Sequence, residues 1–188
     1  MKAPLRIIAL GLVTAILVLI LDQATKVWAL TTLQNIPGGM IRLTPFLDIV
    51  ALWNYGISYG LFQQGDTGRW VLVGIKVVAV VAFAIWLTRT RRGADAVALG
   101  LLIGGALGNA IDRVIYGAVF DFISLHALGY HWYVFNVADI AVVVGVIVLL
   151  VDAFFGTASK SPPSGTGIKP ESEARPSGTE TTHDRAKP

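Results

Sequence analysis

The sequence contains no cysteine and few charged residues. Asp, Glu, Lys and Arg make up only 14% of its 188 residues, whereas 54% are hydrophobic. Without cysteine the chain cannot form disulfides, zinc fingers, a thiol nucleophile or a covalent haem link. A soluble domain has about 25% charged residues, and a disordered chain has fewer apolar residues than this one. The composition therefore indicates a small integral membrane protein.

The chain also has no large excess of either positive or negative charge. Residues 157–188 hold 5 of the 15 Lys and Arg residues and 4 of the 12 Asp and Glu residues, so residues 1–156 carry a net charge of only +2. This excess is too small for a nucleic-acid binding face, and we expect no nucleic-acid partner. The acidic residues before residue 157 are all aspartate. Because no glutamate and no HExxH motif accompany His126 and His131, a zinc protease is disfavoured.

Four long apolar segments predict a membrane all-α fold, a bundle of four transmembrane helices. They are residues 7–30, 70–88, 96–111 and 136–155. The first has 24 residues, or about 36 Å of helix at ~1.5 Å per residue, which is enough for one crossing. A cleaved signal peptide is the alternative for this segment, since Lys2 and Arg6 precede it, but no clean small-x-small cleavage pattern follows.

The basic residues predict the orientation of this bundle. They collect before the first segment and between the second and third, as Lys2, Arg6, Arg89, Arg91 and Arg92. Because positive charge is retained on the cytoplasmic side, we expect both termini in the cytoplasm and residues 31–68 and 112–135 outside. Lys76 interrupts the second segment, and its long stem can extend toward the outer surface.

The two outer segments have features of strands at a membrane surface. Residues 41–53 alternate loosely between apolar and polar side chains, which predicts short strands. Both segments carry aromatic side chains suited to the lipid headgroup layer. These are Trp53, Tyr55, Tyr59, Phe62, Tyr130, Trp132, Tyr133 and Phe135. We interpret them as membrane anchors.

Two other patterns concern packing and domain organisation. Gly100, Gly104 and Gly108 recur every four residues, which places small residues on one helix face and allows a neighbouring helix to approach closely. Residues 157–188 are rich in Pro, Ser, Thr and Gly and have no apolar period. We therefore expect a membrane domain of residues 1–156 followed by a disordered cytoplasmic tail.

Polar residues gather at the predicted outer boundary of the spans. The set is Asp22, Lys26, Asn109, Asp112, Arg113, Asn136 and Asp139, with Asn54 and Asp121 in the outer segments. An ionisable group at membrane depth costs about 2.5–3.5 kcal/mol, so such a gathering indicates a site. Each member also has a structural interpretation: Asp22 and Lys26 can neutralise each other at their i, i+4 spacing, and Asp139 can cap the fourth helix.

Paired aspartates suggest one chemistry for this site. Two carboxylates held close together cannot both ionise, so one retains a proton while the other activates water, as in aspartic proteases. A serine nucleophile, Ser58 or Ser124, with Lys26 as base is a rival. A proton-coupled small transporter is an alternative from another class, although its carboxylates should lie near the bilayer midplane. A structural membrane protein is a further alternative. It would use the glycine face of the third segment for helix packing and would need no paired aspartates.

Five blocks of sequence resemble a known family, in the family's order. They are Asp22–Lys26, Asn54–Gly60, Gly104–Arg113, Val119–Phe122 and Phe135–Asp139. In these blocks the chain resembles the lipoprotein signal peptidases, or type II signal peptidases, of the bacterial cytoplasmic membrane. The resemblance runs from the first span to the fourth and leaves out the tail. One departure is Tyr59, where the family usually has Phe.

The resemblance implies a four-helix aspartic endopeptidase with a small extracytoplasmic β-cradle at the membrane surface. Such an enzyme cleaves a prolipoprotein just before the cysteine that carries diacylglycerol. The family's catalytic pair falls on Asp121 and Asp139. The matching residues that line or support the site are Asp22, Lys26, Asn54, Gly56, Asn109, Asp112, Arg113 and Asn136. We expect a monomer that uses neither metal nor cofactor, with membrane lipid and a lipidated prolipoprotein as its partners.

Overall fold

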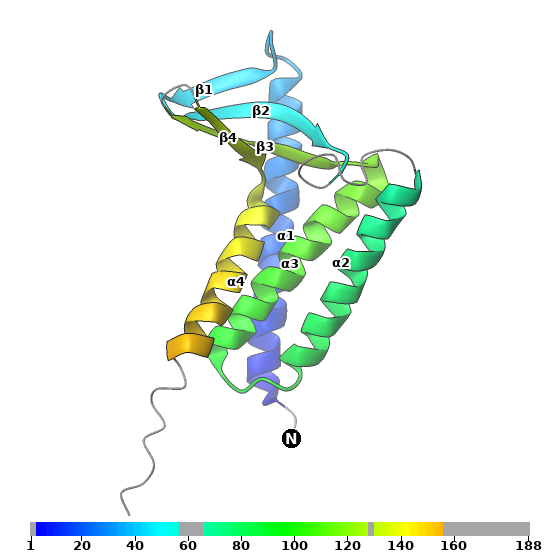
Figure 1. Ribbon diagram of the computed structural model, residues 1–188, viewed down its shortest axis with the longest axis vertical. Coiled ribbons are helices and arrows are strands. Elements are labelled where there is room, and N and C mark those ends of the chain that lie inside the picture. Colours follow the sequence, from blue (N-terminus) through cyan, green and yellow to red (C-terminus); the bar gives the residue numbers. More distant parts are fainter. Residues whose placement is uncertain (1–2, 57–65, 128–129, 156–188) are drawn as a thin grey trace, which may run out of the picture.

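The computed structural model describes residues 3–56, 66–127 and 130–155, without the side chains of Asp66, His131 and Trp132. Four long helices form a bundle and four strands form a sheet at one end of it (Figure 1). The helices are α1 (Leu5–Leu33), α2 (Asp66–Leu87), α3 (Gly93–Tyr116) and α4 (Val137–Phe155). In the described part of the chain, all four are long and apolar enough to cross a membrane, which confirms the predicted class.

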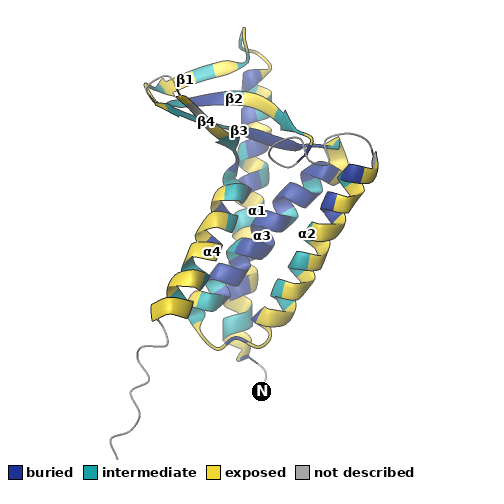
Figure 2. Ribbon diagram, in the orientation of Figure 1, coloured by how far each residue is buried: buried dark blue, intermediate teal, exposed yellow. Residues whose placement is uncertain are grey.

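Helix α3 lies at the centre of the bundle and packs against the other three helices. Most of its ribbon is buried along the middle of the helix, whereas α1, α2 and α4 leave much of their surface exposed (Figure 2). The exposed side chains of these outer helices are large and apolar, such as Leu17, Val78 and Ile147. Apolar side chains on the outside of a bundle match a lipid environment rather than water.

Small residues on α3 make this central position possible. A Cβ atom at Gly104 would lie 2.6 Å from the Ala15 carbonyl oxygen of α1, and one at Gly105 would lie 2.5 Å from the Ala138 carbonyl oxygen of α4. Gly100 and Gly108 face α1 in the same way. The predicted glycine face therefore packs on α1, and Gly105, on another face, admits α4.

The sheet is antiparallel and follows chain order. Its strands are β1 (Met40–Thr44), β2 (Leu47–Asn54), β3 (Val119–Ala127) and β4 (Tyr130–Phe135). Ile49, Phe120 and Phe122 of the sheet pack on Ala29 and Leu33, the last turns of α1. This small apolar core attaches the sheet to the bundle.

The two largest differences from the predicted span boundaries are at the end of the third span and at the start of the second. The third span was expected to end at residue 111, but α3 continues to Tyr116 and ends at Gly117, whose φ of 81° is the left-handed conformation typical of a helix C-terminus. Asp112 and Arg113 are therefore inside the helix, and both are buried. A prediction from hydropathy stops a span at the first charged residues. Here the two charged side chains have polar partners inside the protein, so the helix continues past them. The second span begins earlier than expected, at Asp66.

Several sequence predictions lie outside the described residues. They concern Ser58, Tyr59, Gly60, Phe62 and the tail, residues 157–188.

Candidate active site

Asp121 lies on β3 above the bundle and is only 1% exposed. Its two carboxylate oxygens accept hydrogen bonds from side-chain amides, at 3.0 Å from Asn54 and 2.6 Å from Asn136. Burial, together with the nearby charge of Asp139, raises the pKa of Asp121 to about 6, although the two amides act in the opposite direction. The side chain is thus held in place by two donors and binds a proton more tightly than an ordinary aspartate does.

Asp139 is positioned by the start of α4. Asn136 is the residue before the helix, and its side-chain oxygen accepts a hydrogen bond from the Asp139 backbone amide at 3.0 Å. In return, the Asp139 carboxylate accepts from the Asn136 backbone amide at 3.3 Å. This reciprocal pair is a capping box with Asp in the place of the usual Glu. Asp139 can therefore stabilise the start of α4, as the sequence suggested, and also belong to the site.

Two asparagines join the carboxylates into one network. Asn109 of α3 donates to Asp139 at 2.8 Å, and its oxygen accepts from Asn136 at 3.1 Å. Since Asn136 also donates to Asp121, the path from one carboxylate to the other runs through two amide side chains. Asn136 is completely buried and Asn109 is 4% exposed. The network fixes the direction of both carboxylates.

A buried charge cluster lies beside this network. Lys26 is 2.8 Å from Asp22 on its own helix and also 2.8 Å from Asp112 on α3. All three residues are at most 3% exposed. Gln23, which sequence reasoning missed, donates to both aspartates. Its polarity next to Asp22 was the only available signal.

Arg113 holds the end of β2 over the bundle. Its guanidinium donates to the carbonyl oxygens of Asn54 and Gly56, each at 3.3 Å. The Asn54 side chain also accepts from the Gly56 backbone amide at 3.2 Å, which forms a tight local turn. Arg113 therefore orients the asparagine that donates to Asp121.

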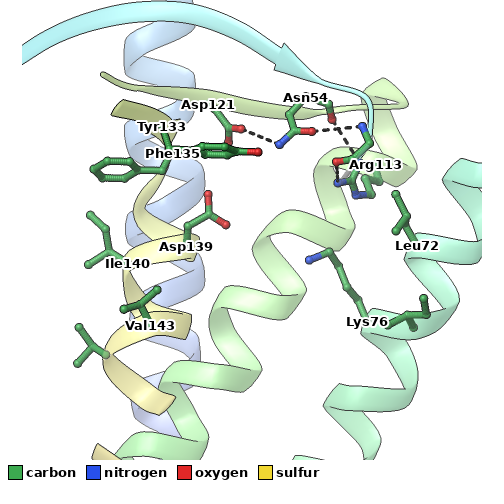
Figure 3. A pocket seen from close by; sticks show the side chains of 13 residues that line it. Asn54, Leu72, Lys76, Arg113, Asp121, Tyr133, Phe135, Asp139, Ile140 and Val143 are labelled. Atoms are coloured by element: carbon green, nitrogen blue, oxygen red, sulfur yellow. Dashed lines mark hydrogen bonds between the residues drawn. The ribbon is translucent and has the colours of Figure 1, made fainter. Parts of the chain in front are cut away.

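A cavity of about 660 Å³ opens beside the two carboxylates. Its polar lining is Asn54, Lys76, Arg113, Asp121 and Asp139, and its apolar wall includes Leu72, Ile75, Ile140, Val143 and Val144. Figure 3 shows Asp121 and Asp139 on the same side of this space, with α2 opposite them. The site can hold an apolar substrate in the bundle and present a polar group to a carboxylate pair.

Of the rival residues, Ser124 and His126 are described, and neither lines this cavity. Ser124 is buried on β3 and is not among the described residues that line it. His126 is 3.0 Å from Asp48 of β2, on the sheet. Among the described residues no group of three His, Cys, Asp or Glu side chains could hold a metal ion. Sequence reasoning did not foresee Lys76 in the cavity lining.

These features define an integral membrane protein with a paired-carboxylate site, the arrangement used for acid-base hydrolysis. The family described as Signal peptidase (SPase) II matches residues 14–155. The chain belongs to this family and is therefore a membrane peptidase.

Relatives and solved structures agree with this assignment. The lipoprotein signal peptidase of Rhodopseudomonas palustris (strain ATCC BAA-98 / CGA009) is 50% identical over 161 residues, covering 82% of this chain and 98% of the relative. That of Methylorubrum extorquens (strain PA1) is 52% identical over 144 residues, covering 76% and 84%. A solved bacterial membrane enzyme has a TM-score of 0.69 at 32% identity, covering 80% of this chain and 91% of its own. The transporter alternative has no support in these matches.

Proposed function

We propose that this peptidase removes signal peptides from diacylglyceryl-modified prolipoproteins, cutting just before the lipidated cysteine, with Asp121 and Asp139 as its catalytic pair. The observation that carries the proposal is that two carboxylates, joined by one hydrogen-bond network, line the same cavity, and that this cavity has an apolar wall. The names of the relatives supply the substrate class. An apolar signal peptide fits the wall, and a peptide bond at its end reaches the carboxylates.

The chemistry follows from the different surroundings of the two aspartates. Asp121, with its raised pKa, holds the shared proton, and ionised Asp139 takes a proton from water as the water oxygen attacks the scissile carbonyl carbon. Asp121 gives its proton to the carbonyl oxygen, which forms a neutral tetrahedral diol. The carbon–nitrogen bond then breaks. The amide nitrogen takes the proton from Asp139, and one diol hydroxyl returns a proton to Asp121.

The remaining polar residues hold this pair. Asn54 and Asn136 orient Asp121, while Asn109 and the capping box orient Asp139. Arg113 and Gly56 fix the loop of Asn54. Asp22, Lys26 and Asp112 support the elements that carry the pair. We assign these residues positioning roles, because only Asp121 and Asp139 exchange protons with substrate and water.

The proposed location is the bacterial cytoplasmic membrane, with both termini in the cytoplasm and the site near the outer face. Two features support this orientation. The sheet, with Asp121 on β3, and the start of α4, with Asp139, lie at one end of the bundle, and the start of α1 and the end of α4 lie at the other (Figure 1). Arg89, Arg91 and Arg92 join α2 to α3 at that second end, where positive charge marks the cytoplasmic side.

We further propose that one chain suffices, without metal or cofactor. The described part of one chain already supplies both carboxylates and an apolar wall, and a carboxylate pair activates water without a Lewis acid. Cleavage should therefore continue in the presence of a chelator. Residues 157–188 form a separate cytoplasmic extension in this proposal, so an enzyme truncated after residue 156 should retain the full rate.

The test is a cleavage assay with purified protein in detergent and a diacylglyceryl-modified prolipoprotein. The unmodified enzyme should give the shortened product, whereas Asp121→Asn and Asp139→Asn should each lower the rate by about a thousandfold or more, without adding in the double variant. Asp152→Asn, at the opposite end of α4, is the matched control and should stay active. Loss of activity in Ser124→Ala with turnover by Asp121→Asn would favour the serine chemistry instead.

A further inference from the structure

Among the charged residues that line the cavity in the described part of the chain, Lys76 is the one that the proposed mechanism does not use. It lies ten residues after Asp66 in a helix of 22 residues, so it is about 15 Å from the start of α2 at ~1.5 Å per residue. This places its backbone near the middle of a membrane-spanning segment. A cation at that depth is expensive, and intramembrane charges usually face a cavity and serve a function.

The amine of Lys76 points into the cavity rather than toward lipid. Figure 3 shows it extending from α2 toward the space opposite Asp139, on the side of Arg113 that faces away from the sheet. The nearby charged groups include two cations, Arg113 and Lys26, and two acids, Asp139 and Asp121. None of the hydrogen bonds or ion pairs among the described residues includes the Lys76 amine.

Substrate binding changes what this amine can contact. Lys76 is half-buried, and water can reach its ammonium group. A bound apolar segment displaces that water, and a buried donor left without an acceptor is strongly unfavourable. The acceptor must then come from the substrate. Within the bilayer a lipidated signal peptide offers carbonyl oxygens, either of its backbone or of the two ester groups of its diacylglyceryl moiety.

The peptide also has a reason to need such a donor. A signal peptide crosses the bilayer as a helix, and the last four carbonyl groups of a helix have no partner within it. A protease requires an extended backbone at the cut, so the helix must end below the carboxylates. Unpaired carbonyls in the hydrocarbon region cost several kcal/mol each unless the protein supplies donors, and a cation is favoured at a helix C-terminus.

We propose that Lys76 is a substrate-positioning residue that donates hydrogen bonds to a carbonyl oxygen of the bound substrate, on the membrane side of the scissile bond. The proposal rests on the proposed function, because it takes the occupant of the cavity to be a lipidated signal peptide. It adds a polar contact from α2 to a cavity whose other charged residues lie on α3, α4 and the sheet. Removing the amine should weaken binding and leave the proton transfers intact.

The test is steady-state cleavage of a diacylglyceryl prolipoprotein by Lys76→Met, Lys76→Arg and the control Arg91→Met. A hydrogen bond to a charged donor predicts a loss of about tenfold or more in kcat/KM for Lys76→Met, mainly through KM. Lys76→Arg keeps a donor and should recover part of that loss. Arg91→Met removes an exposed charge far from the cavity and should match the unmodified enzyme. Methionine is tolerated in a membrane span, so the thermal midpoint of Lys76→Met should not fall.

A substrate with ether-linked chains identifies the acceptor, because it lacks both ester carbonyls. If Lys76 contacts an ester carbonyl, the ether substrate already lacks that contact, so Lys76→Met and the unmodified enzyme will cleave it with the same kcat/KM. If it contacts the peptide, the same fold loss will appear on both substrates. Either result supports the proposal.

Two results would overturn the role of Lys76 without affecting the proposed function. One is an unchanged KM and kcat/KM for Lys76→Met while the unmodified enzyme cleaves normally, because Lys76 would then be only a tolerated charge. The other is a loss confined to kcat, which would place the amine in the chemistry. By contrast, a failure of the unmodified enzyme to cleave the lipidated substrate would contradict the proposed function and, with it, this inference.

Discussion

The ammonium of Lys26 on α1 lies 2.8 Å from Oδ2 of Asp112 on α3, the same distance as from Asp22 on its own helix. Each aspartate also accepts from a backbone amide: Asp22 accepts from Ala138 at 2.9 Å through its other oxygen, Oδ1, and Asp112 accepts from Phe120 at 3.2 Å through the same Oδ2. Ala138 directly precedes Asp139, and Phe120 directly precedes Asp121. The cluster thus ties together the two backbone segments that carry the proposed catalytic pair.

Replacing Lys26 should therefore damage the fold. In Lys26→Met, two nearly inaccessible carboxylates lose their cation, and breaking a buried pair from one side typically costs about 3–5 kcal/mol. We expect a loss of this size in the free energy of unfolding, measured by denaturant or thermal unfolding in detergent. The control is Arg42→Gln, because Arg42 is exposed and 3.7 Å from Asp48, a contact worth less than about 1 kcal/mol. A stable but inactive Lys26→Met enzyme, rescued by an added amine, would instead make Lys26 a catalytic base.

Asn136 has two functions that different substitutions can separate. Its oxygen caps α4, and its amide group orients Asp121. Asn136→Ala removes both, whereas Asn136→Ser keeps a capping oxygen and removes the donor. We expect Asn136→Ser to be about 1 kcal/mol more stable than Asn136→Ala, and both to lose most activity. Thermal unfolding and cleavage rates of the two variants provide the measurement. Full activity in Asn136→Ser would show that orientation of Asp121 does not depend on this amide.

The raised pKa of Asp121 predicts a pH dependence of stability. Its pKa is about 6 in the folded protein against an ordinary value of 3.8. Between these values the unfolded chain has released the proton and the folded protein retains it, so the free energy of unfolding falls as pH rises. At about 1.36 kcal/mol per unit of pKa difference, this group contributes about 3 kcal/mol in total, of which about 2 kcal/mol is lost from pH 4 to pH 6.

Asp121→Asn should abolish this contribution, since asparagine does not titrate. Unfolding midpoints measured from pH 4 to pH 7 should therefore fall less steeply in Asp121→Asn than in the unmodified protein. Ser124→Ala, a non-titrating change at a buried position of the same strand, should keep the original slope. Equal slopes for all three proteins would show that the folded state does not hold the Asp121 proton in this window.

The sequence was sufficient to locate the spans and to pick out polar residues that the folded chain brings close together, because hydropathy and local polarity are short-range properties. It could not show that Lys26 pairs with Asp112 as well as Asp22, since i, i+4 spacing reveals only the partner on the same helix. Nor could it show that α3 continues through Asp112 and Arg113. The free-energy cost of burying these two charged side chains depends on their partners from α1, β2 and β3, which are distant in the sequence. Lys76 could be placed in a span, but which neighbour it faces depends on how α2 packs.

The lipid on the substrate should determine much of the cleavage rate. The apolar wall of the cavity belongs to α2 and α4, which also present large apolar side chains to the bilayer. Acyl chains held in the bilayer beside these helices would confine the scissile bond to the sheet end of the bundle, next to Asp121 and Asp139. Such confinement raises the effective concentration of the bond at the carboxylates, an advantage that an unlipidated peptide lacks. We therefore expect the unlipidated precursor to be cleaved at least tenfold more slowly than its diacylglyceryl form, at matched concentration in the same detergent. A precursor with a single acyl chain should give an intermediate rate, and equal rates for all three would mean that the peptide alone positions the bond.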